Sequence, residues 1–212
     1  MISVWFLIAL FALMVLGWIL WKTATRIDKL HRKVVAAKIS LDQQLQRRAG
    51  AAIDLAVSGL LDPASALLIA NEAYAIADSL DPIGEPEFAM ELKGLSMARE
   101  LGESELSSCL RQVFPDETAI TDIRANPIGD ELMYRLVSTW YRCELVRRFH
   151  NQAVADARAL RRHWWVRVFH LAGHAELPET CELDDAMSPA LAAAAVVRAN
   201  REGAGENLCY PL

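Results

Sequence analysis

The chain has 212 residues, a formal net charge of −5 and a hydrophobic content of 53%. That length accommodates one membrane anchor and one domain with its own core, and the negative charge excludes the broadly basic surface of a typical nucleic-acid-binding protein. The four cysteines stand far apart and form no CxxC pair, which excludes a dense disulfide framework and indicates free thiols in a reducing compartment.

The first predicted element is a transmembrane helix over residues 2–21, a stretch without charged side chains. At a helical rise of about 1.5 Å per residue it spans about 30 Å, the thickness of bilayer hydrocarbon. Trp18, Trp21 and Lys22 stand at its end, where aromatic and basic side chains favour the headgroup region. The charged first region and the cleavage site of a signal peptide are missing, so we expect a retained anchor.

Positive charge follows this apolar stretch and does not precede it. Because segments rich in lysine and arginine tend to stay in the cytoplasm, we expect a single-pass protein of the cell (inner) membrane with the bulk of its chain cytoplasmic. Free thiols fit that side. The basic residues are Lys22, Arg26, Lys29, Arg32 and Lys33, and Asp28 is the acid among them.

Beyond the anchor, apolar side chains recur at spacings of three and four, which indicates one stripe on one helix. No proline precedes Asp62-Pro63, so the anchor is predicted to continue into a stalk that rises about 60 Å above the membrane. The small alanines of the stripe also permit close packing between copies of the chain. The stripe consists of Ile27, Leu30, Val34, Ala37, Leu41, Leu45, Ala49, Ala52, Ala56 and Leu60.

The middle of the chain predicts shorter elements. Asp62-Pro63 and Asp81-Pro82 each combine a capping residue with a proline suited to a first turn, so each predicts a helix end followed by a new start. The expected elements are a helix over 63–80, a helix from about 87 that ends at Leu101-Gly102, a short helical piece over 105–114 and a loop over 115–129.

The last long helix is predicted over 130–171, with Gly173 as its stop. A polar extended segment over 174–185, a short alanine-rich helix over 188–201 and a disordered tail follow. The predicted class is therefore all-α: a single N-terminal transmembrane helix that continues into an antiparallel helical bundle with two long helices. The domains are an anchor over 2–21, a cytoplasmic bundle over 22–173 and a C-terminal segment over 174–212.

Antiparallel packing of the long helices brings two polar clusters to one height. If residue 173 returns to the level of residue 21, residue numbers at equal height sum to roughly 194, because both helices rise equally. A polar layer of this kind fixes helix register. A catalytic pocket is the alternative, but a nucleophile–base pair and a phosphate-binding loop are missing. The layer comprises Asp42, Gln43, Gln44, Arg47 and Arg48 on the first helix and Glu144, Arg147, Arg148 and Asn151 on the last.

The same register predicts a second segment within about two turns of the bilayer. Tryptophan beside arginine is typical of an interfacial contact. The alternative is that Trp164 belongs to the core stripe and that the arginines are simply solvated. The segment contains Arg161, Arg162, Trp164, Trp165 and Arg167.

Histidines and paired arginines late in the chain raise the questions of a metal site and a nucleic-acid site. His170 and His174 have the spacing of two zinc ligands on a helix, with Glu176 and Cys181 behind them. Because His174 follows the expected helix stop and no HExxH or CxxC motif accompanies the pair, we expect no metal and no cofactor. The paired arginines of the last helix alternate with acids and apolar residues, so we expect solvated helix faces and no nucleic acid.

Two motifs resemble those of the LemA family, bacterial membrane proteins with one N-terminal anchor and a helical bundle. The stretch Leu41-Asp42-Gln43-Gln44-Leu45-Gln46-Arg47-Arg48 resembles the family's first-helix motif. The stretch Arg148-Phe149-His150-Asn151-Gln152-Ala153-Val154 resembles its second motif, and Gly173 with Cys181-Glu182 is similar to a glycine and a Phe-Glu pair near the family's end. The resemblance covers about residues 20–60 and 140–185.

This chain departs from the LemA pattern at several positions. His150 stands where the family has tyrosine, Ala157-Arg158 replaces a frequent second Tyr-Asn pair, and 49–57 lacks the usual proline. The resemblance implies a divergent member with the family's fold and membrane location. The family brings no established reaction, so no catalytic role is implied.

We therefore predict a non-enzymatic scaffold or interaction protein of LemA type, tethered to the cytoplasmic face of the membrane. Its expected partners are the membrane and an unidentified protein, with a homo-oligomer as a further possibility. The alternatives are a lipid-organising protein that acts through the tryptophan–arginine segment, and a membrane-bound enzyme whose site the sequence does not reveal.

Overall fold

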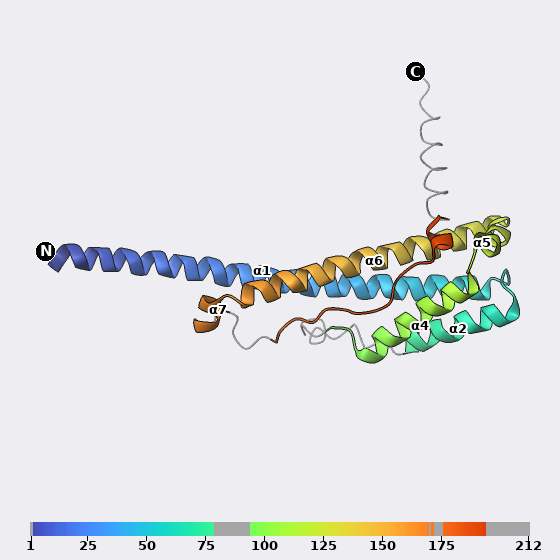
Figure 1. Cartoon of the computed structure of the whole chain (residues 1–212), viewed down its shortest axis with the longest axis horizontal. Coiled ribbons are helices and arrows are strands. Elements are labelled where there is room, and N and C mark those ends of the chain that lie inside the picture. Colours follow the sequence, from blue (N-terminus) through green and yellow to red (C-terminus); the bar gives the residue numbers. More distant parts are fainter. Residues whose placement is uncertain (1, 79–93, 170, 172–175, 194–212) are drawn as a thin grey trace, which may run out of the picture.

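The structure is a computed structural model that describes residues 2–78, 94–169, 171 and 176–193. Within these ranges every regular element is a helix, which confirms the predicted all-helical class. The helices are α1 (Ile2–Val57), α2 (Pro63–Asp78), α4 (Met97–Val113), α5 (Glu117–Arg124), α6 (Pro127–Arg161) and α7 (Trp164–Val168) (Figure 1). A further helical turn covers 189–193.

Helix α1 is one unbroken rod whose N-terminal part extends beyond every other helix (Figure 1). This part is long and apolar enough to cross a membrane, a property that membrane spans share with N-terminal signal sequences, and none of it is buried in the fold. The rod ends near the predicted position. Gly59 adopts the left-handed conformation (φ 74°) that turns the chain, and the Asp62 carboxylate then accepts the first amide hydrogens of α2.

Helix α6 lies along α1 and runs in the opposite direction (Figure 1). Val34 packs against Ala153 and Ala157, and nearer the N-terminus Ile27 packs against Leu160. The heights differ from the predicted register by about one and a half to two helical turns: Asp54 pairs with Arg135 at 3.1 Å and Ile27 packs against Leu160, whereas partners near residues 140 and 167 were expected. The predicted register is therefore approximate, because it assumed an unbroken helix to residue 171 whereas α6 ends at Arg161.

The main core occupies the half of the bundle farther from the apolar extension, where α2 and α4 pack beside α1 and α6 (Figure 1). Alanines of α1 permit this close packing: Ala49, Ala52 and Ala56 are buried within the chain's own core. These positions are therefore not available for packing between copies. The largest fully buried apolar side chains here are Leu55, Ile69, Ile76, Leu106, Leu110, Phe114, Met133, Leu136 and Trp140.

Several predicted boundaries were wrong, and each error has a local cause. Helix α4 passes through Gly102, where a helix end was predicted, because Ser96 caps one continuous amphipathic helix. The predicted start near residue 87 lies outside the described residues. The predicted loop over 115–129 contains α5, capped by the Asp116 carboxylate, and the start of α6.

At the other end, α6 stops at Arg161 instead of continuing to residue 171. His163 is extended (φ −64°, ψ 133°) and separates α6 from the short helix α7. The predicted stop at Gly173 lies outside the described residues. The extended segment after it is present from residue 176 onward, and Ser188 precedes a helical turn as expected; the rest of the alanine-rich helix and the tail lie outside the described residues.

The corner between α5 and α6 depends on a glycine. A Cβ atom placed on Gly129 would lie 2.1 Å from the backbone oxygen of Ile123, a distance that only a backbone shift can relieve. Asn126 caps α6 and Pro127 occupies its first turn, so the corner is held from both sides.

We predict that Gly129→Ala destabilises the protein although alanine is the better helix former. The matched control is Gly50→Ala on α1, where an added Cβ meets nothing within 4 Å and should stabilise the helix by about 1 kcal/mol. Denaturant unfolding of the detergent-solubilised full chain measures both changes. A stabilising Gly129→Ala would contradict the close approach.

Candidate functional site

The most unusual feature inside the bundle is a buried guanidinium. Arg48 of α1 has no solvent exposure, and its Nη1 donates to the Ser107 hydroxyl at 2.9 Å. Its Nη2 donates to the backbone oxygen of Glu103 at 2.9 Å and to the carboxylate Oε2 of Glu103 at 2.7 Å. Both charged side chains of this pair are fully enclosed, so each depends on the other for compensation.

A second arginine completes the charge balance. Arg99, one turn before Glu103 on α4, is 4% exposed and donates through Nε to Glu103 Oε1 at 2.9 Å. Its Nη2 lies 3.8 Å from a carboxylate oxygen of Asp42. Two guanidinium groups therefore alternate with two carboxylates, which leaves no net charge in the group. We call Asp42, Arg48, Arg99, Glu103 and Ser107 the buried charge network.

Trp140 joins the buried charge network to the rest of the molecule. The guanidinium carbon of Arg48 lies 5.4 Å from the centre of the fully buried Trp140 ring, a cation–π contact with α6. The indole nitrogen of Trp140 donates to the backbone oxygen of Asp185 at 2.7 Å. The network therefore fixes α1, α4 and α6 at a common height.

The backbone that Trp140 contacts belongs to residues 176–188, an extended segment that we call the strap. It contains neither helix nor strand, yet Cys181, Leu183 and Asp185 are buried while Glu182 and Asp184 between them are exposed. This is the period-2 alternation of a strand without a neighbouring strand. Helix side chains must therefore satisfy its backbone polar groups.

Side chains of α6 bind the strap along its length. Asn151 forms a reciprocal pair with the backbone of Cys181: its Nδ2 donates to the carbonyl at 3.0 Å, and its Oδ1 accepts from the amide at 2.9 Å. Arg147 binds the carboxylate of Asp185 with two bonds of 2.6 and 2.7 Å. Arg158 donates to the carbonyl of Pro178 at 2.7 Å.

Helix α4 binds the other side of the strap. The amide of Asp184 donates to the Ser104 hydroxyl at 3.0 Å, and the amide of Glu182 donates to the Glu100 carboxylate at 3.1 Å. Arg111 pairs with the Asp184 carboxylate at 2.6 Å and also donates to the carbonyl of Ala186. The strap thus lies between α4 and α6 and connects them (Figure 1).

The structure does not bring the predicted polar layer together at one site: some of its residues enter the buried charge network or bind the strap, and the others lie elsewhere. Asp42 and Arg48 enter the buried charge network, where their ion-pair partners come from α4, while the last long helix contributes the Trp140 ring that contacts Arg48. Asn151 binds the strap. Glu144 and Arg148 pair with each other along α6, with Arg148 exposed. Gln43 and Arg47 are exposed and Gln44 is half-buried.

Sequence reasoning missed the α4 half of the network. Arg99, Glu103 and Ser107 recur every four residues and so share one helix face, a visible signal. The break predicted at Gly102 divided this row between two elements.

The predicted membrane-interface residues also separate into groups. Trp18 and Trp21 are exposed, and the Lys22 ammonium lies 4.6 Å from the centre of the Trp18 ring. The remaining residues lie around α7: Trp164, Arg162 and Arg167 are exposed, Trp165 is half-buried and stacks on His163 at 4.6 Å, and Arg161 turns to the carbonyl of Glu176.

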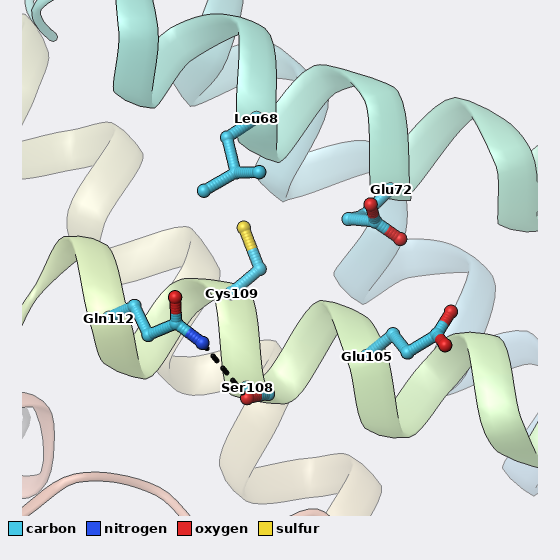
Figure 2. Close-up of a pocket in the computed structure, with 6 residues that line it drawn as sticks. All are labelled: Leu68, Glu72, Glu105, Ser108, Cys109 and Gln112. Atoms are coloured by element: carbon cyan, nitrogen blue, oxygen red, sulfur yellow. Dashed lines mark hydrogen bonds between the residues drawn. The ribbon is translucent and has the colours of Figure 1, made fainter.

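A shallow groove between α2 and α4 contains a thiol beside two carboxylates. Figure 2 shows the Cys109 thiol directed toward Leu68, with Glu72 and Glu105 to one side. Burial, with a further contribution from the charge of Glu72, raises the pKa of Cys109 to about 11. The thiol therefore stays protonated at neutral pH, which is unsuitable for a nucleophile.

The other described cysteines are also poor nucleophiles and poor metal ligands. Burial raises the pKa of Cys143 to about 12 and raises the pKa of Cys181 as well. Among the described residues, no group of three His, Cys, Asp or Glu side chains is placed to hold a metal ion. His170 and His174, the pair with the spacing of zinc ligands, lie outside those residues.

Comparison with models of protein families, with curated proteins and with solved structures finds no match to this chain. The resemblance to the LemA family, based on the motifs around Asp42 and Asn151, therefore stays a prediction.

We predict that Arg48→Ala lowers the free energy of unfolding by about 3–5 kcal/mol, because it removes one partner of an enclosed ion pair. The matched control is Arg148→Ala, which removes the exposed partner of Glu144 and should cost less than about 1 kcal/mol. Denaturant unfolding of the full chain in detergent separates the two cases. Equal losses of unfolding free energy in the two variants would contradict the larger contribution expected for the enclosed ion pair.

Acid should destabilise the protein through His150. Burial, with a smaller effect of the Lys38 charge, lowers the pKa of His150 in the folded state, although hydrogen bonds to the carbonyls of Glu179 and Val34 act in the opposite direction. The unfolded chain therefore binds the proton more readily than the folded chain. The stability contribution is complete above the unfolded pKa of about 6.5 and is lost as the pH falls toward the folded pKa, by up to about 1.4 kcal/mol per pH unit.

Thermal unfolding of wild type and His150→Gln between pH 7.5 and pH 5 checks this expectation. The variant should lose less stability on acidification than wild type. His31, whose pKa burial also lowers, accounts for a remaining slope, and His31→Gln/His150→Gln should reduce it further. A slope unaffected by either substitution would contradict the prediction.

Proposed function

We propose that this protein is a membrane-anchored helical scaffold of LemA type, held at the cytoplasmic face, that presents a helical surface to a partner protein. The observation that carries the proposal is the state of residues 4–21. These residues are uncharged, and the rest of the fold buries none of the stretch that is long enough to span a membrane. The same helix continues without a break into the bundle. Exposed apolar surface of this extent in water would be strongly unfavourable.

The charge distribution supports the cytoplasmic orientation. Basic side chains follow the apolar segment directly, beginning with Lys22, and the acid among them, Asp28, is paired with Arg32. A positive flank of this kind is retained on the cytoplasmic side.

The chemistry of the interior favours a scaffold over an enzyme. The charged side chains of the buried charge network form ion pairs with one another, and the raised pKa values of Cys109 and Cys143 keep these thiols protonated at neutral pH. Buried polar groups that fix helix register are paired with one another in this way, whereas a catalytic group must be able to reach a substrate.

An apolar row on α6 is the surface that we propose for the protein partner. Tyr141, Leu145 and Phe149 lie one turn apart along the helix and are 60%, 39% and 60% exposed. Aromatic side chains of this kind are enriched at the energetic centres of interfaces. A homo-oligomer would need such a surface as well, since Ala49, Ala52 and Ala56 of the α1 stripe are already covered.

The anchor is tested by fractionation of cells that express the untagged chain. We expect the protein to stay in the membrane pellet after alkaline carbonate washing and to keep an uncleaved mass of about 23.6 kDa. C-terminal fusions to green fluorescent protein and to alkaline phosphatase should be fluorescent and inactive, respectively. A cleaved or soluble protein would overturn the anchor, and the reverse fusion result would overturn the orientation.

The partner surface is tested by a photo-crosslinking amino acid at position 149 in living cells. We expect a discrete adduct that is absent when the probe replaces Gln112, an exposed residue on α4. An adduct of twice the chain's mass would identify a second copy as the partner. The same adducts from both positions, or none from position 149, would contradict this surface.

A further inference from the structure

Helix α7 presents apolar side chains to solvent that the described part of the chain leaves uncovered. Val166 is buried against Ile27 and Leu160, which fixes α7 to the bundle. On the outer side, Trp164 is 67% exposed, Val168 is 60% exposed, and Phe169, directly after the helix, is 44% exposed.

The position of α7 explains what can cover these side chains. Figure 1 shows α7 at the end of the bundle that faces the apolar extension of α1. Its contact point on α1, Ile27, stands about 9 Å beyond Trp21 at a rise of about 1.5 Å per residue. A headgroup layer beside the predicted span would occupy this height, and tryptophan favours that layer.

The charges around α7 match an anionic lipid surface. Arg162 and Arg167 are exposed on either side of Trp164, and the nearby part of α1 adds Lys22, Arg26 and Lys29. Two of the acids near this region have partners of their own: Asp28 pairs with Arg32, and Asp156 lies 4.0 Å from Lys33 and accepts a bond from Gln152. Exposed Glu176, at the end of the strap, accepts the Arg161 guanidinium on its backbone oxygen. Each basic residue within a screening length of about 8 Å contributes to attraction by anionic headgroups.

We propose that Trp164, Val168 and Phe169 form a second membrane contact, a foot that rests in the headgroup region of an anionic bilayer beside the protein's own span. The inference rests on the proposed anchor and sharpens the predicted interface set. Trp165 and Arg161 are excluded from the foot because they are directed to His163 and to the strap. Arg162 and Arg167 supply the electrostatic attraction.

The test uses the full chain in phosphatidylcholine nanodiscs with and without phosphatidylglycerol. An environment-sensitive fluorophore is attached to Val168→Cys in a Cys209→Ser background, in which the other cysteines are buried. We expect blue-shifted emission and quenching by headgroup-level spin-labelled lipid, both stronger with phosphatidylglycerol. Phe149→Cys is the matched control, because Phe149 has the same 60% exposure as Val168 but lies on α6, farther from the predicted span. A label at this position should be unquenched.

Two further labels separate the possible failures. Leu10→Cys should be quenched by deep spin labels; if it is not, the anchor itself fails and the foot with it. If Leu10→Cys is quenched while Val168→Cys and Trp164→Cys both behave like Phe149→Cys, the anchor stands and the foot is overturned. Arg162→Gln/Arg167→Gln should reduce the Val168→Cys quenching in anionic discs toward its value in phosphatidylcholine alone, with Lys22, Arg26 and Lys29 keeping part of the attraction; unchanged quenching would overturn the electrostatic part of the proposal.

Discussion

The positive charge of Arg48 lies at the centre of the bundle without any contact with solvent, and the positions of three helices follow from this constraint. An isolated guanidinium in such a place is prohibitively unfavourable, so α4 must bring Glu103 to within hydrogen-bonding distance. Glu103 has a second oxygen, which binds Arg99, and Trp140 of α6 covers the face of the Arg48 guanidinium. A shift of any of these helices by one turn would leave a buried charge without its partner. Because apolar packing alone tolerates such shifts better, we interpret the network as the element that selects one register.

The strap, a segment without secondary structure of its own, is also held in place by polar side chains of the helices. Its alternating buried side chains fill the space between α4 and α6, while the helices supply the hydrogen bonds that a neighbouring strand would otherwise give. Asn151 copies the donor and acceptor of a peptide group in its bonds to Cys181. Trp140 contacts both the guanidinium of Arg48 and the backbone of the strap, so it connects the buried charge network to the strap. The polar residues on α6 are therefore explained by the strap more than by α1.

Periodicity made the helical class and the long rod of α1 predictable, since a three–four stripe without proline has few other outcomes. The ends of elements were less predictable where short capping signals compete with composition: Asp116 and Asn126 start helices inside a stretch that resembles a loop. The residues of the site were partly predictable. Arg48 and Asn151 were both members of the predicted polar layer, but their hydrogen-bond partners lie on α4 and in the strap, and long-range pairing is not encoded in local pattern. The extended segment itself was expected; its attachment was not, because an isolated period-2 stretch without a partner strand gives a weak signal.

The length of the rod gives the proposed foot a mechanical purpose. A single transmembrane helix tilts by about 20° on average, and nothing in its own sequence prevents rotation about its axis. If residue 21 marks the membrane surface, Val57 stands about 54 Å above it, so a tilt of that size displaces the distal end of the bundle by about 18 Å. A contact between α7 and the membrane would lie to one side of the rod (Figure 1). It would therefore oppose tilting of the rod away from that side and rotation of the rod about its own axis. The buried charge network then matters again: it prevents the helices from sliding, so an orientation set at the membrane is transmitted to the row of Tyr141, Leu145 and Phe149. A scaffold that must present one face at a defined angle needs both features, whereas a flexible tether would need neither.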